Sequence, residues 1–226
     1  MFAGLSSIIL DNDVTEIRGM ASREGEVVSF TAPIILKNYP KINDWLAKLE
    51  LEMRVSLAVL LAQAYADLQA FYNSPDGLDS TRFLKWIDRY PAQLVVVAVQ
   101  LGWTALVEGA LASRQSLDTA LAVVLRGLDV LADTVLTDLV PIHRRKCEHL
   151  ITELVHERDV IRILIENKIN SSTDFSWLYQ MRFYLDLTRS PLDQLSITMA
   201  SATFSYGFEY LGVPDRLVQT PLTDRC

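Results

Sequence analysis

The hydrophobic positions of residues 40–72 recur at steps of three and four. This spacing is typical of an amphipathic helix, because 3.6 residues per turn place such positions on one face. The predicted helix begins after Pro40, carries Glu50 and Arg54 one turn apart on its flank, and ends in the turn-forming segment 73–80. Its apolar stripe contains Ile42, Trp45, Leu46, Leu49, Met53, Leu57, Leu60 and Ala64.

Pro91 divides the next helical stretch into two parts, because proline cannot continue a helix that runs into it. Ser80 is expected to cap the first part, which reaches Tyr90. The second part begins with the most apolar run of the chain, residues 94–107. This run falls short of the ~20 apolar residues that a membrane span requires, so it predicts a helix that is buried on most sides.

Pro141 separates two more predicted helices. The first extends from about Ser116 to Leu139, and the second covers residues 141–170. Pro141 suits the first turn of the second helix, where its missing N–H is not needed. The two core stripes are Leu117, Leu121, Val124, Leu128, Leu131, Val135 and Leu139, and then Cys147, Leu150, Ile151, Leu154, Ile161, Leu164 and Ile165.

Both ends of the chain have the residues of β-structure. In residues 16–30, β-branched side chains flank the glycine-bearing "SREGE", which predicts a hairpin. After Asn170, "MRFYLDL" and "LSITMASATFSYGFEYL" are rich in aromatic and β-branched residues, and the turn-like "TRSPLD" joins them. The predicted fold is mainly α: an elongated bundle of about four long helices with a small N-terminal β-hairpin and a C-terminal β segment. We divide it into residues 1–170 and residues 171–226.

Composition narrows the function classes. A chain of 226 residues with 50% hydrophobic content can bury one large core or two modest ones. A net charge of -7 argues against nucleic acid as a partner, and the short basic run "HRRK" is typical of an exposed helix start. Cys147 and Cys226 form no disulfide framework, which suits a reducing compartment, and no signal peptide or membrane partner is indicated.

Catalytic and metal-binding patterns are not evident. Gly207 and Gly212 are separated by bulky residues and no Lys follows, so they do not form a phosphate-binding loop. His143 and Cys147 lie one helical turn apart, but zinc takes three or four ligands and no second His/Cys pair exists. Three His in one predicted helix also give no catalytic triad. We therefore expect no metal and no catalytic residues in this chain.

An aromatic cluster near the C-terminus has two readings, a platform for stacking nucleic-acid bases or the packing of strands against a helix. The acidic balance of the chain favours packing. The cluster contains Phe175, Trp177, Phe183, Tyr184, Phe204, Tyr206, Phe208 and Tyr210.

Several sequence runs resemble a known family. "FSWLYQMRFYLD", "LSITMASATFSYGFEYLG" and "LVQTPLTDRC" follow one another as they do in dynein heavy chains, at the junction between the linker and the first AAA+ module. Upstream, "PKINDWL", "YPAQLVVVAVQ" and "RRKCEHLITELVHERDV" resemble successive parts of that linker. The resemblance covers essentially the whole chain, and "LVQTPLTDRC" is more similar to the cytoplasmic than to the axonemal branch.

The resemblance implies a noncatalytic mechanical linker, the lever of the power stroke. Residues 1–170 would be the C-terminal part of the linker and residues 171–226 the start of the first module, with the phosphate-binding loop beyond Cys226. ATP or ADP with Mg would bind in the full-length motor and not in this chain alone. Leu217, Val218, Gln219, Thr220 and Pro221 match the segment that runs beside the adenine, so they would form one wall of the nucleotide pocket.

The implied partners are the AAA+ ring of the same heavy chain, the other subunits of the dynein complex, and microtubules, along which the motor moves toward the minus end. The implied location is the cytoplasm, on the cytoskeleton. Two alternatives stay open. The chain could be a free-standing helical scaffold, or a truncated product, that binds partner proteins. An autonomous ATPase is disfavoured by the missing phosphate loop.

Overall fold

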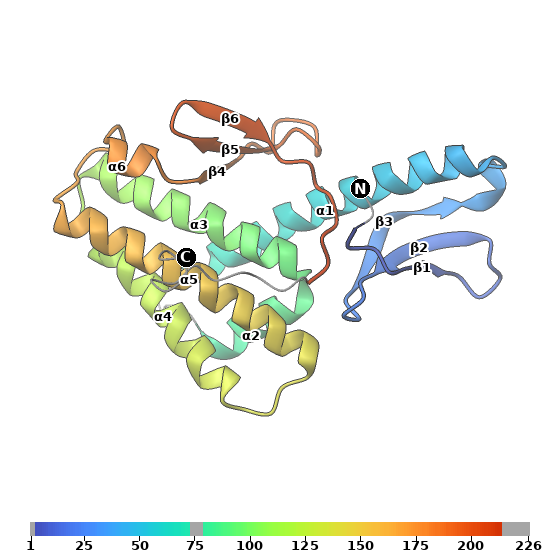
Figure 1. Cartoon of the computed structure of the whole chain (residues 1–226), viewed down its shortest axis with the longest axis horizontal. Coiled ribbons are helices and arrows are strands. Elements are labelled where there is room, and N and C mark those ends of the chain that lie inside the picture. The colour runs from blue at the N-terminus through green and yellow to red at the C-terminus, as the bar shows by residue number, and fades with distance from the viewer. Residues whose placement is uncertain (1–2, 73–78, 214–226) are drawn as a thin grey trace, which may run out of the picture.

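The computed structural model describes residues 3–72 and 79–213, and Figure 1 shows how their elements are arranged. Each long apolar stripe of the sequence forms one helix, as predicted. The helices are α1 (Ile42–Tyr72), α2 (Ser80–Arg89), α3 (Ala92–Ser113), α4 (Asp118–Val135), α5 (Pro141–Glu166) and the short α6 (Phe175–Leu178). The mainly helical fold class, with β-structure toward both ends, is confirmed.

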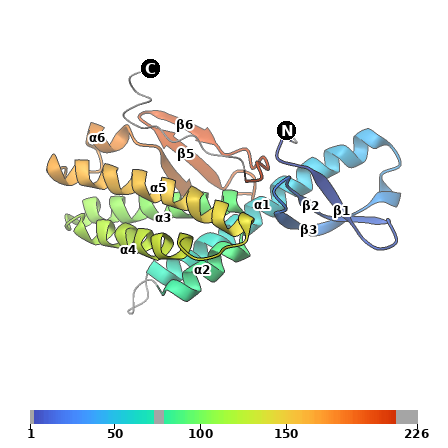
Figure 2. The same ribbon diagram turned by 60° about the horizontal axis from the view of Figure 1, so that its bottom comes forward.

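The N-terminal sheet has three antiparallel strands in the order β1 (Ser7–Leu10), β2 (Glu16–Ala21) and β3 (Val27–Ile35). The predicted hairpin is β2 and β3, and β1 was not predicted. Strand β3 packs on α1, and two polar side chains of α1 bind its backbone. Ser56 Oγ accepts from the N–H of Thr31 at 2.8 Å, and Glu52 Oε1 accepts from that of Ala32 at 3.0 Å. The sheet projects with the first half of α1 from the end of the bundle (Figures 1 and 2).

Helix α3 is the centre of the bundle, because it packs against α1, α4, α5 and strand β4. In the described part of the chain it is the one helix long and apolar enough to cross a membrane, with a mean hydropathy of 1.8. Most of that apolar stretch, 67%, is buried inside the fold. It is therefore the core helix that the sequence predicted.

The helix boundaries follow local chemistry. Pro91 lies between α2 and α3, and Pro141 is the first residue of α5, as predicted. The predicted cap of α2 is wrong by one residue, because Asp79 and not Ser80 accepts from the N–H of Arg82, at 2.7 Å. The predicted ion pair on α1 is confirmed, since a terminal guanidinium nitrogen of Arg54 lies 3.9 Å from Glu50 Oε1.

The C-terminal sheet consists of β4 (Arg182–Leu185), β5 (Leu195–Met199) and β6 (Ala202–Ser205), all antiparallel. It lies along α3 (Figure 2), where Thr104 Oγ1 accepts from the N–H of Phe183 at 3.1 Å. Core packing of the aromatic cluster is confirmed in part. Trp177, Phe183, Phe208 and Tyr210 are buried, whereas Phe175 and Phe204 are exposed by 70% and 62%.

Candidate functional site

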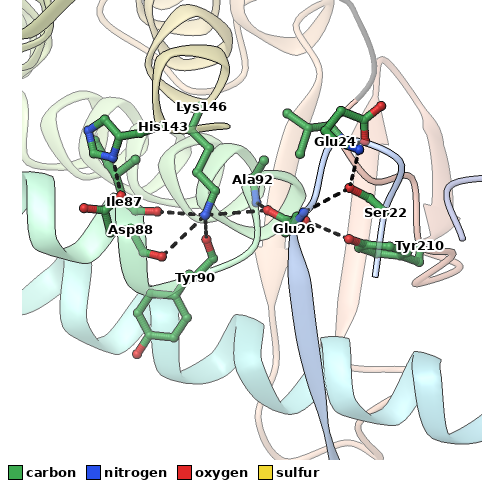
Figure 3. Close-up of polar contacts among 11 residues, drawn as sticks. Ser22, Glu24, Glu26, Ile87, Asp88, Tyr90, Ala92, His143, Lys146 and Tyr210 are labelled. Atoms are coloured by element: carbon green, nitrogen blue, oxygen red, sulfur yellow. Dashed lines mark hydrogen bonds and ion pairs between the residues drawn. The ribbon is translucent and has the colours of Figure 1, made fainter. Parts of the chain in front are cut away.

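A network of polar contacts lies where three parts of the fold meet a C-terminal segment (Figure 3). We name this place the junction. It comprises the turn between β2 and β3, the corner between α2 and α3, and the first turns of α5. The C-terminal segment, residues 206–213, crosses it without forming a helix or strand, and we name this segment the strap.

A buried ion pair lies at the centre of the junction. Lys146 Nζ on α5 lies 3.6 Å from Glu26 Oε1 in the turn, and the two side chains are only 7% and 4% exposed. Charges taken out of water are costly unless they are paired and hydrogen-bonded. The other contacts of both groups therefore decide whether this pair is stable.

Lys146 satisfies carbonyls that the corner leaves without donors. In a continuous helix the carbonyl of Ile87 would accept from the N–H of residue 91, but Pro91 has none. Lys146 Nζ donates instead to the carbonyls of Ile87 at 3.2 Å and Tyr90 at 2.7 Å. A cation at a helix C-terminus is also stabilised by the helix dipole.

Glu26 performs the complementary task for α3. Its Oε1 accepts from the N–H of Ala92, the first residue of α3, at 2.7 Å. A carboxylate is favoured there by the free N–H groups and by the positive end of the helix dipole. The ion pair thus has its cation at the end of α2 and its anion at the start of α3, and it fixes the corner between them.

The strap is bound to this ion pair by Tyr210. Its hydroxyl donates to Glu26 Oε2 at 2.9 Å, and the side chain is fully buried. Burial, together with the nearby carboxylate of Glu26, raises the pKa of Tyr210 far above its ordinary value. The phenol therefore remains a proton donor at any physiological pH.

Gln93 on α3 holds the strap at three further points. Its Nε2 donates to the carbonyl of Glu209 at 2.8 Å and to the hydroxyl of Tyr206 at 2.6 Å. Its Oε1 accepts from the N–H of Leu211 at 3.0 Å. One side-chain amide therefore binds three polar groups of a segment that is not part of a strand.

The strap also touches the N-terminal sheet closely. A Cβ added to Gly4 would lie 2.3 Å from the carbonyl carbon of Leu211, so only glycine permits this approach. Gly212 adopts a φ of +66°, which glycine tolerates without strain, and Glu24 Oε2 accepts from the N–H of Val213 at 3.4 Å. The strap is therefore bound to the helices on one side and to the N-terminal sheet on the other.

The side chains of His143 and Cys147 do not point to a common metal site. His143 contacts the carboxylate of Asp88, whereas Cys147 is fully buried in the core one turn later. Burial raises the pKa of Cys147 to about 11, which keeps it protonated. Among the described residues, no group of three His, Cys, Asp or Glu side chains could hold a metal ion.

The predicted nucleotide-pocket residues Leu217, Val218, Gln219, Thr220 and Pro221 lie outside the described residues. The sequence did not point to three residues of the junction: Gln93 and Glu26, which bind the strap, and Lys146, which binds Glu26 and the corner. One signal was available, because Pro91 deprives a helical carbonyl of its donor and so requires a donor from elsewhere. Nothing in the sequence pattern says which residue supplies it.

Comparison with known proteins gives consistent matches. The family model described as "Dynein heavy chain, N-terminal region 2" matches residues 1–64. Cytoplasmic dynein heavy chains of Drosophila melanogaster and Dictyostelium discoideum are 48% and 47% identical to the chain over all of its length. The axonemal heavy chain 2 of Mus musculus is 33% identical over 93% of the chain.

The higher identity to the cytoplasmic heavy chains agrees with the predicted branch and with a cytoplasmic location. The chain spans about 5% of the length of these cytoplasmic relatives. By sequence along its full length, the chain belongs to the dynein heavy chain family.

Proposed function

We propose that this chain is the noncatalytic mechanical linker segment of a motor heavy chain, a lever that carries force between the remainder of the heavy chain and its AAA+ ring. In this proposal ATP hydrolysis takes place in the ring, with ATP or ADP and Mg bound there. The resulting movement is directed toward the microtubule minus end. The other subunits of the dynein complex act through the full-length protein.

One observation carries the proposal: the strap is fastened at the same place where the N-terminal sheet and three helices meet. Tension on the strap would act through Tyr210 on Glu26, and through Gln93 on α3. The Lys146–Glu26 ion pair would pass that tension to α5 and to the corner between α2 and α3. A lever needs such a rigid attachment, because a loose one would absorb the movement as local unfolding.

The proposal is tested in the full-length heavy chain with the substitution Lys146→Met. The AAA+ ring keeps its residues, so ATP turnover should continue, while microtubule gliding slows severalfold because the lever no longer transmits force. Arg18→Met removes an exposed ion pair with Glu16 and is the matched control, which should glide normally. Normal gliding by Lys146→Met would contradict a force path through the junction.

The noncatalytic assignment has its own test. The purified chain should show no magnesium-dependent ATP turnover above background, because the proposal assigns the phosphate-binding and catalytic groups to the ring. Measurable turnover that is lost on heat denaturation would overturn it. Leu217 to Pro221 would form only one wall of the adenine pocket, without the phosphate-binding loop. We therefore expect no useful affinity of the chain alone for ATP, and equilibrium dialysis measures that affinity directly.

A further inference from the structure

A basic cleft lies between α1 and α2, and it borders the corner between α2 and α3. It has a volume of about 290 Å³. Its lining residues are Asp67, Ala70, Phe71, Arg82, Lys85, Trp86 and Arg89. Three cations and a single carboxylate line it, in a chain whose net charge is -7. This local reversal of charge has no part in the proposed force path.

The cations of the basic cleft share one face of α2. Arg82, Lys85 and Arg89 follow one another at steps of three and four and are exposed. The Arg82 guanidinium lies over the ring of Phe71, 5.2 Å from its centre, and that of Arg89 lies 5.3 Å from the centre of the Tyr90 ring. Stacking on an aromatic face restrains a guanidinium and leaves its N–H edge open to a partner.

The single carboxylate of the basic cleft, that of Asp67, already has hydrogen-bond partners. Asp67 Oδ2 accepts from the hydroxyl of Tyr90 at 2.7 Å and from Arg89 at 3.3 Å. Within residues 3–72 and 79–213, Arg82 and Lys85 make no ion pair with a carboxylate. The basic cleft therefore presents unneutralised positive charge on a restrained frame.

We propose that the basic cleft is a docking surface for an acidic protein segment, whose Glu or Asp carboxylates bind Arg82 and Lys85. A guanidinium presents paired N–H groups that match the two oxygens of a carboxylate, and an aromatic floor accepts the methylene groups of a Glu side chain. A nucleotide fits less well, because the volume lies at the lower limit of ligand pockets and α2 is already capped by Asp79.

The test uses the 226-residue chain and a short fluorescein-labelled oligoglutamate peptide in a fluorescence-anisotropy titration. Arg82→Glu with Lys85→Glu should weaken binding about tenfold or more, and added salt should weaken the unmodified chain's binding as well. Both residues are exposed, and glutamate at position 82 would stand in the first turn of α2, where it is favourable, so α2 should remain folded. Circular dichroism measures the retained helix content.

A matched control makes the same change of charge elsewhere. Lys37→Glu with Lys41→Glu alters two exposed cations before α1 and should leave the affinity for the peptide nearly unchanged. An equal loss in both double variants would show general electrostatic attraction and overturn the proposal. Stronger competition by inorganic pyrophosphate than by unlabelled oligoglutamate would assign the cleft to phosphate instead. Sedimentation that shows a dimer only with Arg82 and Lys85 intact would assign it to a second copy of the chain.

Discussion

Lys146 and Glu26 are 120 positions apart in the sequence, yet Lys146 Nζ lies 3.6 Å from Glu26 Oε1 with both side chains buried. The pair satisfies the end of α2 and the start of α3 at once. Truncating one member leaves the other as an unpaired buried charge. Truncating Lys146 also removes the donor to the carbonyls of the corner. The end of α2 and the start of α3 are then no longer held together by the ion pair.

We predict that Lys146→Met lowers the free energy of unfolding by about 3–5 kcal/mol. The measurement is urea denaturation followed by circular dichroism. Arg18→Met is the control, since its exposed pair with Glu16 is expected to contribute about 1 kcal/mol or less. Adding Glu26→Gln to Lys146→Met should recover part of the loss, because the unpaired charge is gone. A double variant no more stable than the single one would contradict this account.

We predict that Gln93→Ala frees the strap without unfolding the bundle. Three polar groups of the strap lose their partner, at a cost of about 1–3 kcal/mol. Amide hydrogen exchange should become faster at Leu211 and stay unchanged in the centre of α3. Gln69→Ala removes a side chain whose Nε2 donates to the hydroxyl of Tyr65 on the same helix, at 2.6 Å, and it should change neither exchange rate. Unchanged exchange at Leu211 would show that Gln93 does not hold the strap.

Two glycines give opposite predictions for the same substitution. Gly4→Ala should destabilise the chain by about 1–3 kcal/mol, because its Cβ would lie 2.3 Å from the carbonyl carbon of Leu211. Gly109→Ala should stabilise it by about 0.5–1 kcal/mol, since a Cβ on that exposed helical position meets nothing within 4 Å. Thermal denaturation of both variants measures the two changes in stability. Equal effects would show that the strap does not approach Gly4 closely.

Glu157 on α5 should make stability fall with rising pH. Burial, and then the charge of Glu153, raises its pKa well above the ordinary value of 4.5. Above pH 4.5 the unfolded chain releases this proton while the folded chain retains it, so the folded state loses up to about 1.4 kcal/mol per pH unit until the raised pKa is reached.

Glu157→Gln tests this dependence, because the amide has no proton to lose. The variant should match the unmodified chain near pH 4.5 and become progressively more stable than it toward neutral pH. Urea denaturation across this pH range gives both slopes. Parallel slopes for Glu157→Gln and the unmodified chain would contradict the prediction.

The helices were predictable from the sequence for a local reason. The stripe of α1 repeats with the helical period, and Pro91 and Pro141 act on their own backbone, so neither requires knowledge of distant residues. The hairpin of β2 and β3 was predictable from its turn for the same reason. Strand β1 was missed, because its four residues show no clear alternation and its stability comes from pairing with β2.

The site depends on contacts that no local pattern encodes. Leu217 to Pro221 were named from a resemblance and stay a prediction, since they lie outside the described residues. Phe204 and Tyr210 are both aromatic residues of the same stretch, yet one is exposed and the other fully buried. The difference arises because β6 is an edge strand, whereas the strap turns back onto the junction.

The sequence by itself determined the helical periods, the proline boundaries, the acidic balance and the family. Only the tertiary structure decided that Glu26, Gln93, Lys146 and Tyr210 form one network. The physical reason is that a buried polar group requires a partner wherever the fold can supply one. That partner is selected by the packing of α2, α3 and α5 in space, and distance along the chain does not restrict it.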